Sequence, residues 1–229
     1  MSDLVSTIPP ALATAAQFQL FFPSLCEDAP ASDPMALSQV LVEATAFIES
    51  SVGRRLAPFS NLTESHRLFG IDPTEYGASS DSPLDLYGSL GLSRAAAYGS
   101  GNLVRKFWVD QTAPHYADLW TYSVGSISLD LTFGSQILVQ PSSIEGGGPH
   151  PDTGECRLRL GTFAPEGTTI VITYGGGYTV AIPADLQRLC RYVAAKMIIL
   201  DMEPQSRKEM NLDEIELQIT AMLSNWAKS

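Results

Sequence analysis

Apolar residues recur at three- and four-residue steps over residues 34–52, which is the spacing of one face of an α-helix. Asp33 is placed to cap this helix, Pro34 suits its first turn, and Gly53 suits its end. We therefore predict a helix over residues 34–52. A shorter helix is expected around residues 11–21.

Two further helices are predicted after Pro183. Residues 184–201 carry apolar side chains around much of the helix circumference, which is typical of a buried helix. Residues 207–226 carry an apolar stripe on one side and carboxylates on the other. This stripe consists of Leu212, Ile215, Ile219, Met222 and Trp226.

Between these helices, short apolar runs are separated by Gly, Pro, Ser, Asn and Asp, which is typical of strands joined by turns. Apolar and polar residues alternate in residues 126–133, which predicts a strand with one buried face and one exposed face. Residues 72–101 and 142–154 are expected to be long loops. The other expected strands are residues 103–109, 136–140, 156–160 and 168–174.

The order of these elements predicts an α+β fold. One helix precedes and two follow a mostly antiparallel, enlarged β domain, and the helices are expected to pack beside it. We expect three parts along the chain. These are an N-terminal arm (1–32), a helical core (33–56 and 179–229) and a β-rich region (57–178).

The composition limits which partners the protein can have. The chain has 229 residues, of which 45% are hydrophobic and 17% charged, and its formal net charge is −11. An acidic chain is repelled by phosphates, which argues against a DNA-binding regulator or nuclease but allows a conduit that DNA passes without being held. The low charged fraction suits large contacts between subunits. We expect no membrane-spanning segment, because no apolar run is long enough.

Candidate catalytic residues are scarce. His66, His115 and His150 have no neighbours at the spacing of metal ligands, and the three cysteines form no disulfide or zinc pattern. The glycine triplets at 146–148 and 175–177 lack the features of a phosphate loop, so turns or bulges are expected there. We expect no enzyme activity, catalytic residue, metal or cofactor.

Two alternatives of other classes stay open. A pocket that unites one of the histidines with a carboxylate and a nucleophile would indicate a hydrolase. Exposed Trp and Tyr side chains gathered on one face of the sheet would indicate a carbohydrate- or protein-binding module.

Two segments of the chain resemble the head–tail connector (adaptor) proteins of tailed bacteriophages. In that family an early helix ends in an Ile-Glu … Gly-Arg pattern, and a strand ending in Thr-Tyr-x-x-Gly-Tyr leads to a Pro that opens an Ala-rich helix. The first pattern is matched by residues 44–56, which include Ile48, Glu49, Gly53, Arg54 and Arg55. The second is matched by residues 171–186, which include Tyr174, Gly177, Tyr178 and Pro183.

The resemblance implies a structural virion protein that is assembled in the host bacterial cytoplasm. Such proteins form a ring, often twelve-fold, under the portal, extend the DNA channel and dock the next neck or tail protein. Their terminal helix commonly reaches the portal. This implies portal or subunit contacts for Leu212, Ile215, Ile219, Met222 and Trp226. Arg54 and Arg55, which follow the first long helix, are a second candidate for a portal or subunit contact, through an acidic surface of the partner.

Other interpretations of these residues remain open. The terminal helix could instead pack within its own subunit, and the two arginines could instead interact with the end of their own helix. Another neck or tail-completion protein is the nearest alternative function.

Overall fold

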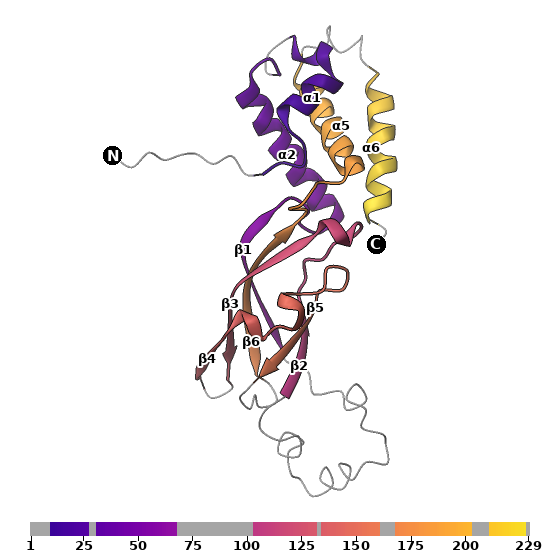
Figure 1. The fold of residues 1–229 in the computed structure, drawn as a ribbon. Coiled ribbons are helices and arrows are strands. Elements are labelled where there is room, and N and C mark those ends of the chain that lie inside the picture. The colour runs from indigo at the N-terminus through magenta and orange to yellow at the C-terminus, as the bar shows by residue number, and fades with distance from the viewer. Residues whose placement is uncertain are drawn as a thin grey trace, which may run out of the picture. The chain divides into compact units, whose positions relative to one another are not determined.

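The computed structural model describes residues 10–27, 31–67, 103–131, 134–160, 168–202 and 211–227 (Figure 1). Within these residues the chain forms helices and strands in the order helix, strands, helix. The elements are α1 (Ala15–Phe21), α2 (Pro34–Val52), β1 (Phe59–Arg67), β2 (Leu103–Trp108), β3 (Thr121–Asp130), β4 (Gln136–Val139), β5 (Glu155–Leu160), β6 (Thr169–Gly177), α5 (Ala184–Asp201) and α6 (Leu212–Ala227).

The chain divides into two compact units. The helical unit comprises the described residues of Met1–Phe59, Ala113–Thr121 and Gly177–Ser229, and the β unit those of Ser60–Thr112 and Tyr122–Gly176. The predicted α+β fold class is confirmed. In the described parts of the chain, no helix combines the length and apolar character that crossing a bilayer requires.

Helix α2 has the bounds that the sequence predicts. The Asp33 carboxylate accepts the Met35 N–H at 2.9 Å, which caps the first turn, and Gly53 ends the helix in the left-handed region at φ 78°. Leu37, Leu41, Ala44 and Ile48 form the buried side of the helix. This side packs against α5, and α2 also contacts α6 (Figure 1).

Helices α5 and α6 pack against each other in the helical unit (Figure 1). The bounds of α5 agree with the prediction, and Pro183 is its N-cap residue. Of the helix predicted over 207–226, the described part begins at Leu212, and Asn211 accepts the Glu214 N–H at 3.3 Å. The residues before Asn211, back to 203, lie outside the described part.

The short helix α1 is attached to both α2 and α5. Thr14 and Gln17 form a capping box at its start. The Leu12 N–H donates to Thr45 Oγ1 in α2 at 3.0 Å, and the Gln17 amide donates to Gln187 Oε1 in α5 at 2.8 Å. Residues of the predicted N-terminal arm therefore form part of the helical unit.

The β unit contains a four-stranded sheet in the order β1-β6-β3-β4 and a two-stranded antiparallel sheet of β2 and β5. Strand β3 begins at Thr121, five residues earlier than the 126 predicted. The expected alternation is wrong at Ser128, because this residue is buried between Ile127 and Leu129. Its hydroxyl accepts the Gln136 side-chain N–H at 3.1 Å, which satisfies the buried polar group.

Strands β2, β4 and β5 match their predictions closely, and one strand was not predicted. The missed strand is β1, which contains few apolar residues, although its burial alternates along most of its length. The expected loop at 142–154 contains two short 3-10 turns, and Ile144 forms a bridge with Leu158 of β5. The expected loop at 72–101 lies outside the described residues.

Candidate functional site

The side chain of Glu49 organises the chain that follows α2. Its Oε1 atom accepts the backbone N–H groups of Leu56 at 2.7 Å and of Ala57 at 2.9 Å. Leu56 is fully buried and Ala57 is 6% exposed, so both donors are withdrawn from water. A buried backbone N–H needs an acceptor, and the Glu49 carboxylate supplies one for two such groups.

The end of β6 and the residue after it contact the same segment, Leu56 and Ala57. The Tyr178 N–H donates to the Leu56 carbonyl at 3.2 Å. Gly177 has φ +113°, and a Cβ at this position would lie 2.7 Å from the Ala57 carbonyl oxygen. Only glycine fits such a close approach in this backbone region. The two segments that carry the family resemblance therefore contact each other, and we call residues 49–57 with 177–178 the junction.

The glycine triplet at 175–177 differs from its prediction. A turn or bulge was expected over the triplet, whereas these residues form the end of strand β6. The change of direction falls on Gly177 and the residues after it, before α5 begins at Ala184. In the other triplet, Gly146 and Gly147 do adopt positive φ in a short turn.

Tyr178 connects the junction to the rest of the helical unit. Its side chain is 1% exposed, and its hydroxyl donates to the His115 carbonyl oxygen. Its ring makes edge contacts with Trp120 at 5.2 Å and Trp226 at 6.1 Å between centroids. Burial raises the pKa of the Tyr178 phenol above its usual value, so the hydroxyl stays protonated and remains a donor.

The predicted contact residues of α6 lie on the side that packs within the helical unit. Ile219 is 6% and Trp226 2% exposed, and Leu212, Ile215 and Met222 are half-buried. This packing matches the alternative left open for the helix. The opposite side of α6 is exposed, and a role of either side at the portal remains a prediction.

The two predicted arginines lie after the end of α2. Arg54 is half-buried and Arg55 is exposed. The Arg55 guanidinium lies 5.7 Å from the centre of the Phe59 ring, within the range of a cation–π contact. Their predicted role at a portal or subunit contact is untested by this geometry.

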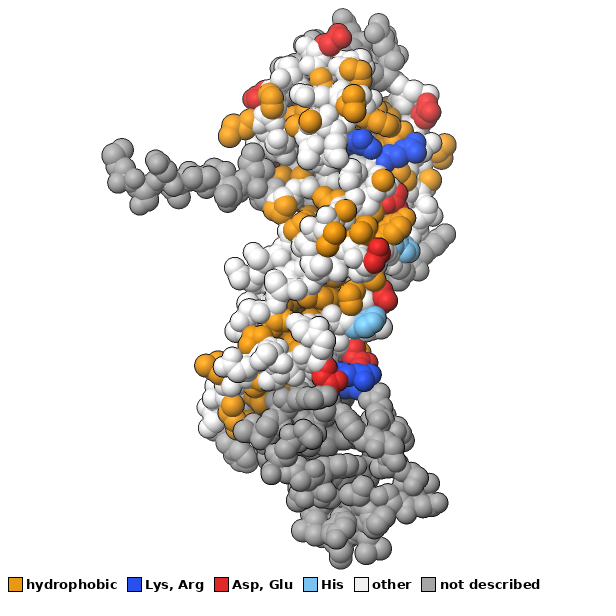
Figure 2. All heavy atoms as spheres, viewed as in Figure 1, with side chains coloured by type: hydrophobic (Ala, Val, Ile, Leu, Met, Phe, Trp, Pro, Cys, Tyr) orange, Lys and Arg blue, Asp and Glu red, His pale blue; other side chains and the backbone are white. Residues whose placement is uncertain are grey.

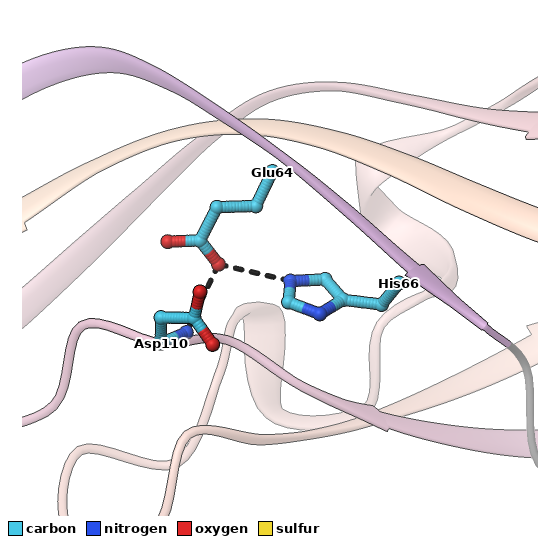
Figure 3. Close-up of side chains that lie close together, drawn as sticks. All are labelled: Glu64, His66 and Asp110. Carbon is cyan, nitrogen blue, oxygen red and sulfur yellow. Dashed lines mark hydrogen bonds and ion pairs between the residues drawn. The ribbon is translucent and has the colours of Figure 1, made fainter.

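A polar cluster of Glu64, His66 and Asp110 lies in the β unit, and it includes one of the three histidines considered in the sequence (Figure 3). Glu64 and His66 project from the same face of β1, and Asp110 follows β2. The Glu64 Oε2 atom lies 2.9 Å from His66 Nε2 and accepts the Asp110 N–H at 2.9 Å. Its other oxygen accepts the Tyr174 hydroxyl hydrogen bond at 2.5 Å.

One imidazole nitrogen and two carboxylates within 4.8 Å are a donor set that could hold a divalent cation. In the structure, however, both oxygens of Glu64 already accept hydrogen bonds, and His66 Nε2 is in contact with one of them. The cluster is therefore a hydrogen-bonded network that ties β1 to β6 and to the segment after β2.

The same network tests the hydrolase alternative. His66 does lie beside carboxylates, as that alternative requires, but the neighbouring groups are poor nucleophiles. Burial raises the pKa of the Cys156 thiol to about 12, and burial with the Glu64 hydrogen bond raises the pKa of Tyr174 above its usual range. Neither group is deprotonated at neutral pH.

Another histidine, His150, lines a shallow pocket of about 340 Å³ in the β unit, together with Glu145, Thr153, Glu155 and Arg157. Glu155 forms ion pairs with Arg157 at 2.6 Å and Lys106 at 3.6 Å. The hydrogen bond from Arg157 contributes most to lowering the pKa of this carboxyl. The carboxylate next to His150 is thus engaged by cations rather than available as a base.

The binding-module alternative requires an exposed aromatic surface on a sheet. Among the described Trp and Tyr residues of the β unit, Trp108 is 41% exposed, Tyr122 is half-buried and Tyr174 is buried. These residues form no exposed aromatic cluster within the described part of this unit.

No family model matches the chain, and no curated protein matches it. Two solved structures are similar to it over its whole length. One is described as the neck of a native GTA particle computed with C12 symmetry, with 16% identity, a TM-score of 0.47 and 93% of that chain covered. The other is the neck of an empty GTA particle computed with C6 symmetry, with 16% identity, a TM-score of 0.49 and 94% covered. At this distance, the similarity is too weak for the function of this chain to be inferred from it.

Proposed function

We propose that this protein is a structural virion component, a head–tail connector that forms a ring under the portal. The ring extends the DNA channel and docks the next neck or tail protein. It needs no cofactor and catalyses no reaction.

The junction is the observation that carries this proposal. The sequence resemblance rests on two segments that are separated by more than a hundred residues along the chain. In the structure the Tyr178 N–H of the second segment donates to the Leu56 carbonyl of the first, and the Leu56 N–H donates to Glu49 within the first segment. A match by chance has no reason to select two segments that form one structural element, so the contact supports reading them as one family feature.

The chemistry of the surface supports the same proposal. A chain with a net charge of −11 repels DNA, which suits a conduit that must not retain the genome during its passage. Hydrophobic side chains reach the surface among polar ones on the face drawn in Figure 2. The exposed large apolar residues of the helical unit include Leu20, Met35, Phe47 and Leu217. Such side chains are covered when subunits assemble.

The experiment is to mix the purified full-length chain with portal rings of the same virus and to image them by negative stain. An added ring on one face of the portal is expected. Portal rings that stay unchanged at saturating protein would overturn the connector role. In that case the nearest alternative, another neck or tail-completion protein, is tested with purified tails and with preassembled neck complexes.

A further inference from the structure

The helical unit exposes a surface that combines cations with aromatic and aliphatic side chains. We call it the cationic patch, and it consists of Leu20 and Phe21 of α1 with Arg188, Arg191 and Tyr192 of α5. Leu20 is 86% and Phe21 42% exposed. The Phe21 and Tyr192 rings meet edge to face at 5.9 Å.

Both arginines of the cationic patch are held in place by aromatic rings. The Arg191 guanidinium lies 4.6 Å from the centre of the Phe21 ring, and that of Arg188 lies 5.4 Å from the centre of the Tyr192 ring. Such stacking fixes the direction of a long side chain. Arg188 Nη2 also donates to the Tyr192 hydroxyl at 3.4 Å.

The two guanidinium groups lack an acidic partner among the described residues. No carboxylate there forms an ion pair with Arg188 or Arg191, and the buried Nε atom of Arg191 has no hydrogen-bond acceptor. The chain as a whole has 25 acidic and 14 basic residues, so positive charges without partners are unexpected. An arginine that is held in position without a carboxylate partner can form an ion pair with a carboxylate of another molecule.

The exposed side of α6 has the complementary character. We call Asp213, Glu214 and Leu217 the acidic stripe. The three residues lie at helical spacing on one face, all are exposed, and Leu217 is 68% exposed. Within the described residues neither carboxylate forms an ion pair, whereas Glu216 pairs with Lys196 at 2.8 Å.

From this complementarity we propose that the cationic patch of one copy binds the acidic stripe of the next copy. Leu217 packs on Leu20 and Phe21, and the two carboxylates pair with the two guanidinium groups. The contact joins two different surfaces, so a copy that binds one neighbour through its cationic patch can bind another through its acidic stripe. Such head-to-tail contacts close into a ring when the rotation between neighbouring copies divides a full turn evenly. This inference rests on the proposed ring assembly and names the surfaces that build it.

The first test is disulfide cross-linking of the full-length chain carrying Leu20→Cys and Leu217→Cys, with Cys26→Ser to remove the partly exposed native thiol. Under oxidation at assembly concentrations, a ladder of covalent multimers is expected. A variant with only one of the two introduced cysteines cannot form this disulfide between neighbouring copies, so it should give no ladder. A matched control is Phe47→Cys with Leu217→Cys, because Phe47 is also exposed on the helical unit but lies on α2.

The second test exchanges the charges. The variants Arg188→Glu/Arg191→Glu and Asp213→Lys/Glu214→Lys should each weaken self-association by about tenfold or more, because like charges then face each other. Mixed in equal amounts, the two variants should assemble again with alternating subunits. Glu43→Lys, an exposed reversal on α2, should leave assembly unchanged. Melting curves establish that each variant is folded.

The outcomes separate the two proposals. If the wild-type chain assembles, alone or on the portal, but the double-cysteine variant gives no ladder and the charge-exchanged mixture does not assemble, the contact is wrong and the ring proposal stands. If the wild-type chain neither self-associates nor adds to the portal, the ring proposal and this contact both fail.

Discussion

Replacing Glu49 by Ala should destabilise the helical unit strongly, because the change removes one acceptor from two backbone donors. The Leu56 and Ala57 N–H groups would then be left without their partner in a place that water does not reach. A buried donor without a partner costs about 1–3 kcal/mol, so two such donors give about 2–6 kcal/mol. Urea denaturation followed by circular dichroism measures this loss, and the melting temperature should fall by on the order of 10 °C.

The matched control is Glu43→Ala. Glu43 lies on the same helix but is exposed, and it forms no ion pair among the described residues. This change should alter the free energy of unfolding by less than about 0.5 kcal/mol. Glu49→Gln keeps a neutral acceptor and should fall between the two. If Glu49→Ala is no more destabilising than Glu43→Ala, the carboxylate does not hold the junction.

Three further changes probe the junction and the buried groups. Gly177→Ala should destabilise by roughly 1–3 kcal/mol, because φ +113° and the Ala57 carbonyl at 2.7 Å exclude a Cβ; a wild-type denaturation midpoint would contradict this. Trp226→Ala should cost about 3–5 kcal/mol in the same assay if its burial within the subunit is correct, and a loss below about 1 kcal/mol would place the side chain in contact with another molecule instead. Cys156 should resist a thiol reagent at pH 8 in the folded chain while the partly exposed Cys26 reacts, and rapid labelling of both would show that Cys156 is accessible. The pKa of Cys156 in the folded chain is raised to about 12, so the thiol contributes fully to stability below pH 8 to 9, and this contribution is lost as the pH rises towards 12. The melting temperature should therefore decline between these pH values, and it should decline less in Cys156→Ala.

The helices could be predicted from the sequence because the signals that begin and end them are local. Asp33, Pro34 and Gly53 lie next to the positions they determine, and the bounds of α2 agreed at both ends. The same holds for α5, which begins directly after Pro183. A cap or a helix-breaking residue acts within one turn, so no knowledge of the tertiary fold is needed to place it.

The strand β1 and the burial of Ser128 could not be predicted in this way. Residues 59–67 are mostly polar, and they become a strand because β6 supplies their hydrogen-bond partners from across the chain. Ser128 is buried because Gln136 in the neighbouring strand satisfies its hydroxyl. Both outcomes depend on tertiary contacts that periodicity does not contain.

The candidate site was also predictable only where its signals are local. The family patterns identified Glu49, Gly177 and Tyr178, but each appeared as a separate position in a separate segment. Their relation is a tertiary contact centred on Leu56, whose N–H donates to Glu49 and whose carbonyl accepts the Tyr178 N–H. No sequence pattern indicated the polar cluster of Glu64, because the strand β1 that positions Glu64 and His66 was not predicted.

The two sides of α6 differ in character, which bears on how a subunit of the proposed ring can be stable before it assembles. The stripe from Leu212 to Trp226 was predicted to contact another molecule, yet Ile219 and Trp226 are buried against the subunit's own helices. A side chain of that size that waited for a partner would expose a large apolar area on every free subunit and would favour aggregation. Burying the apolar stripe internally and offering Asp213 and Glu214 outward avoids this, because charged surfaces keep free subunits apart until a complementary surface is presented.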